Sequence, residues 1–148
     1  MKRVVISDTS CLIVLSKIGY LDVLKALFEE VWITTEIKNE FGEDLPNWIT
    51  IHNEDNTEIK KILSLGIDSG EASAIALCLK QATDALLIID ERKGRKIAKE
   101  LGIHIIGTLG LLLKAKERGL IPNIEEVLEK IEVTDFRIPT NFKDKFRE

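Results

Sequence analysis

Short apolar runs of strand length alternate with helical patterns along the whole chain, and this alternation is what most restricts its fold. The strand-like runs cover residues 3–7, 31–33, 48–51, 86–89 and 103–106. Apolar residues recur at helical spacing over residues 12–18, 20–28, 36–41, 55–65, 69–82, 91–101, 108–118 and 123–131. Such alternation typically produces a mostly parallel sheet with helices on both faces. We therefore expect a three-layer α/β/α protein with four to five strands.

Size and composition predict a single globular domain over residues 1–148. The chain is 45% hydrophobic and 31% charged, which is ordinary for a folded domain. Its apolar runs are far shorter than the roughly 20 residues that span a membrane. The early charges, Lys2 and Arg3, do not resemble a secretory signal, so we expect a cytoplasmic protein. Cys11 and Cys78 lie in apolar runs, which favours buried thiols over a disulfide or a zinc site.

Four acidic residues are the candidates for chemistry. Asp8 and Asp90 each follow an apolar strand directly, Glu71 opens a helical stretch, and Glu40 lies near the end of a short helix. In a parallel α/β sheet, ligands bind beyond the carboxyl ends of the strands. Acids that gather there repel one another, and a hard cation such as Mg²⁺, held by a few carboxylates and several waters, relieves that repulsion. The sequence therefore predicts metal-dependent chemistry on phosphate.

Each of these acids also has a purely structural explanation. Asp8 and Asp90 are both placed to cap the helix that follows them. Asp68 and Glu71 have the spacing of a capping box, in which the cap and the third helical residue bond reciprocally. Glu40 is equally consistent with an exposed surface acid. From the residues alone, both explanations stay open.

Three further residues are candidates for substrate contact. Ser10 either binds a metal-bound water or caps a helix. Arg92 and Arg95 lie in the first turns of a helix, where cations are locally unfavourable unless Asp90 and a phosphate lie close by. Guanidinium groups bind phosphate in a bidentate manner, although a solvated polar face is the alternative. Thr108, after the last strand, either reaches the same edge or caps its own helix.

The acids stand within a set of segments whose order and spacing are informative. These segments are Asp8-Thr9-Ser10, Glu40 before an apolar residue, Gly70-Glu71-Ala72-Ser73-Ala74-Ile75-Ala76 and Leu86-Leu87-Ile88-Ile89-Asp90. Together they resemble PIN domains. Residues 106–116 with Gly119-Leu120-Ile121-Pro122 are similar to a little-characterised prokaryotic branch of that superfamily. The resemblance covers residues 3–135, and the tail over 136–148 matches least well.

This resemblance implies a PIN-like fold and a Mg²⁺- or Mn²⁺-dependent ribonuclease, often the toxin of a toxin–antitoxin pair like the VapC-type toxins. The acidic quartet of the family maps onto Asp8, Glu40, Glu71 and Asp90, and its small hydroxyl residue maps onto Ser10 or Thr9. Many members have Asp where this chain has Glu71, so direct binding of metal by Glu71 stays open. Asp90 is followed by Glu91, which leaves open which of the two faces the metal.

The expected reaction is in-line attack of a metal-activated water on an RNA phosphodiester. Asp8 and Asp90 are expected as direct ligands, with Glu71 and Glu40 binding metal, holding a metal-bound water or positioning the attacking one. Single-stranded RNA or a tRNA loop suits such a site, although the sequence shows no aromatic stacking platform. The net charge of −4 argues against affinity for bulk duplex.

Two other functional classes are retained as alternatives. One is a non-catalytic PIN-like module that binds protein, and the other is an aspartyl phosphatase, in which Ser10 stands where a second acid is expected. Apolar residues of the second helical pattern, Leu21, Leu24 and Phe28, belong either to the core or to a surface for a homodimer or a small antitoxin protein. The RNA target and the number of metal ions are not specified by the sequence.

Overall fold

In the described part of the chain, the central sheet consists of five parallel strands. The computed structural model describes residues 3–53, 57–81 and 84–138. The strand order is β3-β2-β1-β4-β5, and every neighbouring pair is parallel. The strands are β1 (Val4–Ser7), β2 (Val31–Ile33), β3 (Ile49–Ile51), β4 (Ala85–Ile88) and β5 (His104–Ile106). The predicted parallel sheet is confirmed, and the strand at 48–51 lies at its edge, as expected.

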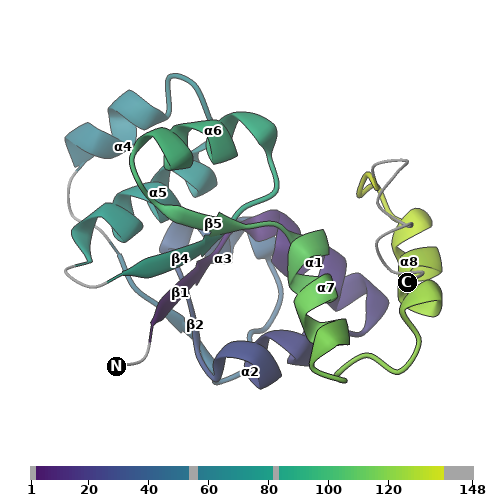
Figure 1. Cartoon of the computed structure of the whole chain (residues 1–148). Helices are drawn as coiled ribbons and strands as arrows, with labels where there is room; N and C mark the ends of the chain where they lie inside the picture. Colours follow the sequence, from purple (N-terminus) through teal and green to yellow (C-terminus); the bar gives the residue numbers. More distant parts are fainter. Residues whose placement is uncertain (1–2, 54–56, 82–83, 139–148) are drawn as a thin grey trace.

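Eight helices connect and cover the described strands on both sides of the sheet (Figure 1). They are α1 (Thr9–Ile18), α2 (Asp22–Phe28), α3 (Thr35–Phe41), α4 (Thr57–Leu63), α5 (Ser69–Lys80), α6 (Arg92–Glu100), α7 (Thr108–Glu117) and α8 (Ile124–Glu132). Helix α5 packs against β1 and β4, α6 against β5, and α2 against β2. The expected three-layer α/β/α architecture is therefore confirmed.

Side-chain caps fix where several helices begin. The Asp8 carboxylate accepts from the backbone N–H of Cys11 at the start of α1. Thr34, rather than Thr35, caps α3 through the N–H of Ile37. Such caps satisfy N–H groups that have no partner within the helix. At the other end, α1 stops at Gly19, whose φ of 80° suits a residue without a Cβ.

The core is centred on β1 and β4, whose side chains are buried on both faces of the sheet. Ile6, Leu87 and Ile88 are fully buried, which explains why these strands read as continuous apolar runs. Cys11 and Cys78 are buried free thiols, as predicted. Leu24 is also fully buried, while Leu21 and Phe28 pack against the core. The core explanation of these three residues is therefore confirmed.

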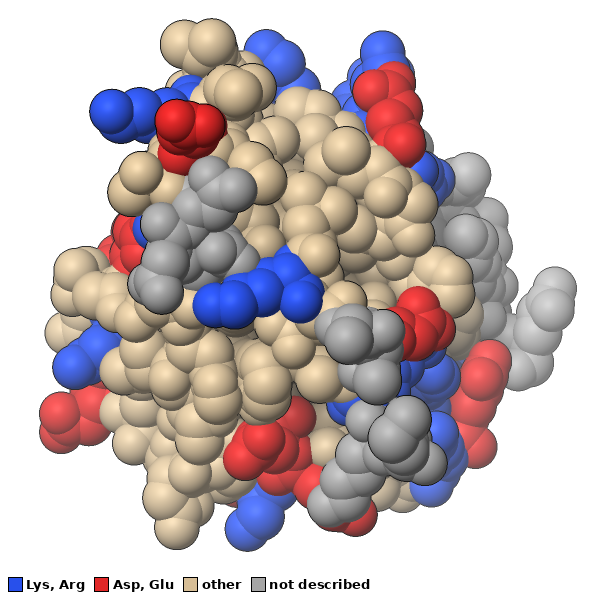
Figure 2. All heavy atoms as spheres, turned by 90° about the vertical axis from the view of Figure 1, so that its left-hand side faces the viewer, with Lys and Arg blue, Asp and Glu red and all other residues tan. Residues whose placement is uncertain are grey.

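Figure 2 shows the side of the molecule that carries the amino ends of the strands. Among the side chains drawn as described, cations and anions are interspersed around a broad uncharged area, so this side carries no basic patch. Next to the first residues of β1, β4 and β5, Arg3 Nη2 and His104 Nδ1 lie 3.4 and 3.3 Å from the Oδ2 atom of Asp84. Within the described ranges, no helix is long and apolar enough to cross a membrane.

Truncation of the core side chain Leu12 tests this packing. Leu12 of α1 is fully buried, and Leu12→Ala should lower the free energy of unfolding by about 2–5 kcal/mol, because it leaves a cavity. Leu65→Ala is the control, since Leu65 is 89% exposed and should change stability by no more than about 0.5 kcal/mol. Urea unfolding measures both variants. Equal losses would contradict the packing described.

Candidate acidic site at the carboxyl ends of the strands

The Asp8 side chain joins the ends of the two central strands. Its Oδ1 atom accepts from the backbone N–H of Cys11 at 3.0 Å, and its Oδ2 atom accepts from the backbone N–H of Asp90 at 2.9 Å. The Asp8 N–H in turn donates to the Ile88 carbonyl at 2.8 Å. Asp8 is thus both the helix cap predicted as its structural role and a buried carboxyl beside Asp90.

Asp90 points to the start of α7. Its Oδ1 accepts from the backbone N–H of Thr108 at 2.7 Å, and its Oδ2 accepts from the Thr108 hydroxyl at 2.6 Å. The expectation that Asp90 caps α6 is therefore wrong. Glu91 is the cap, because its carboxylate accepts from the N–H groups of Lys93 and Gly94. Of the two consecutive acids, Asp90 is the one hydrogen-bonded to Asp8.

Glu71 belongs to the capping box predicted at the start of α5. The Glu71 N–H donates to Asp68 Oδ1 at 2.8 Å, and the Asp68 N–H donates to Glu71 Oε2 at 3.3 Å. Although it is a carboxyl, Glu71 is buried. A Cβ added at Gly94 would lie 3.2 Å from the Oε1 atom of Glu71. The capping role leaves this second oxygen directed toward α6.

Glu40 reaches the same region from α3, although its side chain is exposed. Its Oε1 atom accepts from the Thr9 hydroxyl at 3.2 Å. It also lies directly over Gly70, where an added Cβ would come within 1.8 Å of it. Glu40 is therefore part of the acidic site and not an isolated surface acid.

A cavity of about 200 Å³ lies between these side chains. It is lined by Asp8, Thr9, Ser10, Ile13, Glu40, Asp68, Glu71 and Glu91. Three of the four predicted acids thus share one cavity, and Asp90 lines the neighbouring one together with Ser10 and Glu91. Asp68 was missed as a site residue, although its position in the capping box places it one helical turn from Glu71.

The remaining predicted residues surround this site in different ways. Ser10 is exposed and lines both cavities, but it does not cap α1, because Asp8 does. The Arg95 guanidinium is half-buried, and its Nη1 donates to the Ile89 carbonyl at 2.8 Å. Arg92 is exposed at the first residue of α6. Their roles in binding substrate stay predictions.

Burial makes the ionised forms of these acids unfavourable. It raises the pKa of Asp8 from 3.8 to about 7, and the nearby charge of Asp90 adds to the effect. Burial and then Asp68 raise the pKa of Glu71 from 4.5 to about 8. The pKa values of Asp90 and Glu40 are also raised, again chiefly by burial. A positive charge placed among these carboxyls would favour their ionised forms.

The chemistry of these donors suits a hard divalent cation. No three His, Cys, Asp or Glu side chains in the described parts of the chain converge closely enough to hold an ion by themselves. Mg²⁺, however, is commonly bound through one or two carboxylates and completes its shell with waters. The adjacent carboxyls of Asp8 and Asp90 supply such a pair, and each of their oxygens accepts only one hydrogen bond from the described donors. The residues present therefore fit Mg²⁺ or Mn²⁺.

The fold and the site together define an α/β protein with an acidic cavity beyond the carboxyl ends of its parallel strands, the place where such folds bind ligands. A family model described as a PIN domain matches residues 4–148, so the chain belongs to the PIN-domain family. PIN domains have a nuclease-type fold. The match extends past residue 135 and includes the tail that resembles the family least. Comparison with curated proteins and with solved structures found no match.

The raised pKa of Asp8 predicts a pH dependence of stability in the metal-free protein. Because its folded pKa is about 7 and its ordinary value is 3.8, the folded chain holds more protons than the unfolded chain between those values. Stability should therefore fall as pH rises from about 4 to about 7, by up to about 1.4 kcal/mol per pH unit for one carboxyl. Urea unfolding in EDTA measures this slope. Asp8→Asn should reduce it, and an unchanged slope would show that Asp8 ionises normally.

Gly70→Ala tests the close approach of Glu40. The new methyl group should displace the Glu40 carboxylate, because that group lies at the end of a flexible side chain, while Ala in a helix favours folding by up to about 1 kcal/mol. We expect unchanged or higher thermal stability and about tenfold weaker Mn²⁺ binding by calorimetry. Gly110→Ala is the matched control, since its nearest contact is Ile106 Cγ1 at 3.4 Å. Full Mn²⁺ affinity in Gly70→Ala would show that Glu40 does not contribute to metal binding.

Proposed function

We propose that the protein is a Mg²⁺- or Mn²⁺-dependent ribonuclease that hydrolyses phosphodiester bonds of single-stranded RNA, including tRNA loops. The observation that carries this proposal is the hydrogen-bonded pair of Asp8 and Asp90 at neighbouring strand ends in a PIN domain. Two carboxyls with raised pKa values side by side are costly to the fold. Such a cost is typical of a functional site.

Each side chain has a distinct role in this proposal. Asp8 and Asp90 would hold the metal, with Glu71 as a further ligand or as a partner of a metal-bound water. Once bound, Mg²⁺ or Mn²⁺ would supply an acidified water and stabilise negative charge on the phosphate. Glu40, which is exposed and accepts a hydrogen bond from Thr9, would orient the attacking water. Backbone and hydroxyl donors hold the two ligands in place beforehand.

Two cationic groups would act on the substrate. Arg92, exposed at the start of α6, would contact RNA phosphates. The positive charge of Arg95 offsets a small part of the burial-driven rise in the pKa of Asp90, and its guanidinium is bonded to the Ile89 carbonyl. Arg95 therefore lies near the proposed metal ligand Asp90, where it would contact a phosphate. Ser10, which lines both cavities, would donate to the same phosphate. The net charge of −4 supports local recognition of a short RNA segment over binding of bulk duplex.

The biological setting we propose is that of a toxin in a toxin–antitoxin pair, held inactive by a small antitoxin protein. The resemblance to VapC-type toxins supports this role. A homodimer through Leu21, Leu24 and Phe28 finds no support, because Leu24 is buried and the other two pack against the core. A non-catalytic binding module is the alternative that the following experiment separates.

Cleavage of a total-RNA pool tests the proposal. Wild-type protein should cleave with Mg²⁺ or Mn²⁺ and not in EDTA, and Asp8→Asn should lower the rate by about a hundredfold or more. The matched control is Asp84→Asn, an exposed acid at the opposite end of the sheet, which should cleave like the wild type. Cleavage that survives EDTA would rule out the metal-dependent reaction. A folded wild-type chain without cleavage or Mn²⁺ binding would support the binding module.

A further inference from the structure

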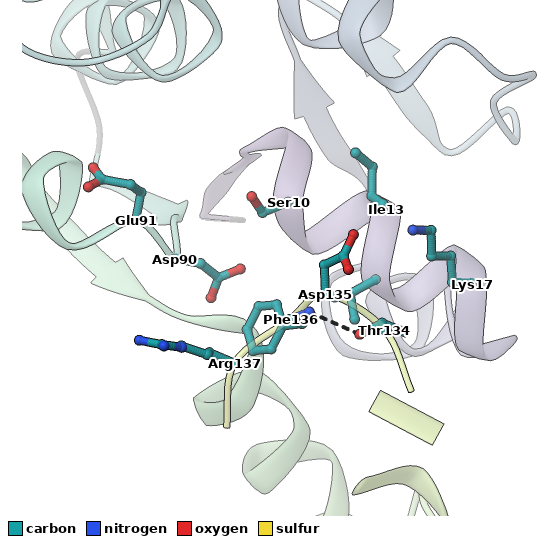
Figure 3. Close-up of a pocket in the computed structure, with 10 residues that line it drawn as sticks. Ser10, Ile13, Lys17, Asp90, Glu91, Thr134, Asp135, Phe136 and Arg137 are labelled. Carbon is teal, nitrogen blue, oxygen red and sulfur yellow. Dashed lines mark hydrogen bonds between the residues drawn. The ribbon is translucent and has the colours of Figure 1, made fainter. Parts of the chain in front are cut away.

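A second, larger cavity adjoins the acidic site. Its volume is about 540 Å³, within the range of about 300–1,000 Å³ that is usual for ligand sites. Asp90, Glu91 and Ser10 line one end, and the segment that follows α8 lines the other side (Figure 3). A ligand in this cavity would therefore touch the acidic residues directly.

The wall formed by the segment after α8 is held in place by Thr134. The Thr134 hydroxyl donates to the Ile131 carbonyl at 2.6 Å and accepts from the backbone N–H of Phe136 at 3.1 Å. Helix α8 itself packs against α1. The ring of Phe136 is half-buried against the core. The Phe136 side chain is therefore part of the cavity wall and is only partly exposed to solvent.

The cavity is lined by an aromatic and apolar wall, by basic side chains and by acidic ones. Phe136 with Ile13 and Val14 provides an aromatic and apolar wall. In Figure 3 the Phe136 ring lies between Asp90 and Lys17, and the Arg137 guanidinium extends on the Asp90 side. Lys17 and Arg137 are both exposed, and the acid Asp135 lines the same cavity. Because a guanidinium group binds phosphate in a bidentate manner, Arg137 is the stronger candidate for an anion.

We infer that this cavity receives the nucleotide next to the scissile phosphate of a single-stranded RNA, with its base stacked on Phe136 and its phosphates contacted by Arg137 and Lys17. This inference rests on the proposed function and adds the substrate subsite to it. An aromatic face accepts any base, whereas guanidinium and ammonium groups bind the backbone. A base can reach Phe136 only when it is unpaired, so the subsite selects single strands over duplexes.

The subsite supplies the stacking platform that the sequence did not reveal. Phe136 lies 46 positions after Asp90 in the chain, yet both line one cavity. Loss of one stacked base typically weakens binding by about five- to hundredfold. Phe136 and Arg137 would therefore govern the affinity for substrate and the position of the cut, while the acidic residues govern the rate of the chemical step.

Steady-state cleavage of a short single-stranded RNA with Mn²⁺ tests this subsite. Phe136→Ala should raise KM by about five- to hundredfold with little change in kcat, and Phe136→Tyr should restore KM, because its ring still stacks. Arg137→Ala should raise KM as well. Val133→Ala, at an 87% exposed neighbour outside the cavity, and Arg118→Ala, at an exposed arginine, are the controls and should match the wild type.

A series of RNAs with one abasic nucleotide each separates stacking from a general effect on folding. For wild-type protein, one abasic position next to the cut should raise KM, and Phe136→Ala should be insensitive to that same position. Equal sensitivity in both proteins, or an unchanged KM in Phe136→Ala, would overturn the subsite while leaving the ribonuclease proposal intact. A wild-type chain that cleaves no RNA with any divalent metal would overturn both.

Discussion

The carboxylate of Asp8 is the group on which the rest of the structure depends. It accepts one N–H from the first turn of α1 and another from Asp90 at the end of β4. A single buried side chain thus starts a helix and joins the two central strands beyond their last paired residues. Because Asp90 is in turn fixed by Thr108, the start of α7 is tied to the same point. Helix α1, the end of β4 and the start of α7 are distant in sequence, and the carboxyls of Asp8 and Asp90 join them.

The carboxyls that we propose as metal ligands are also costly to the stability of the fold. Burial raises the pKa of Asp8 to about 7 and that of Glu71 to about 8, so the metal-free protein holds carboxyls that are unfavourable as anions. Backbone and hydroxyl donors offset part of that cost. Because residues 70 and 94 are glycines, no side chain at these positions displaces the carboxyls of Glu40 and Glu71. A fold selected for stability alone would have apolar residues in place of the buried acids Asp8 and Glu71.

Much of the fold and of the acidic site could be predicted from local sequence patterns, because strand ends and capping boxes are local features. Asp8 and Asp90 directly follow apolar runs, which was sufficient to predict their places at strand ends. The spacing of Asp68 and Glu71 was sufficient to predict the capping box. The pairing of Asp90 with Thr108 was not predictable, since two consecutive acids precede α6 and only the tertiary contact decides which one caps it. Phe136 was missed because its place on the cavity wall depends on how α8 packs against α1.

The order of the chain separates the acidic site from the wall of its neighbouring cavity. All four predicted acids and Thr108 lie within the first 108 residues, together with all five strands. The wall at residues 134–137 follows only after α8. During synthesis, the carboxyls would therefore be present on the ribosome before the surface that we assign to the nucleotide. A chain released early would carry the proposed metal ligands without the wall that we propose aligns the RNA strand.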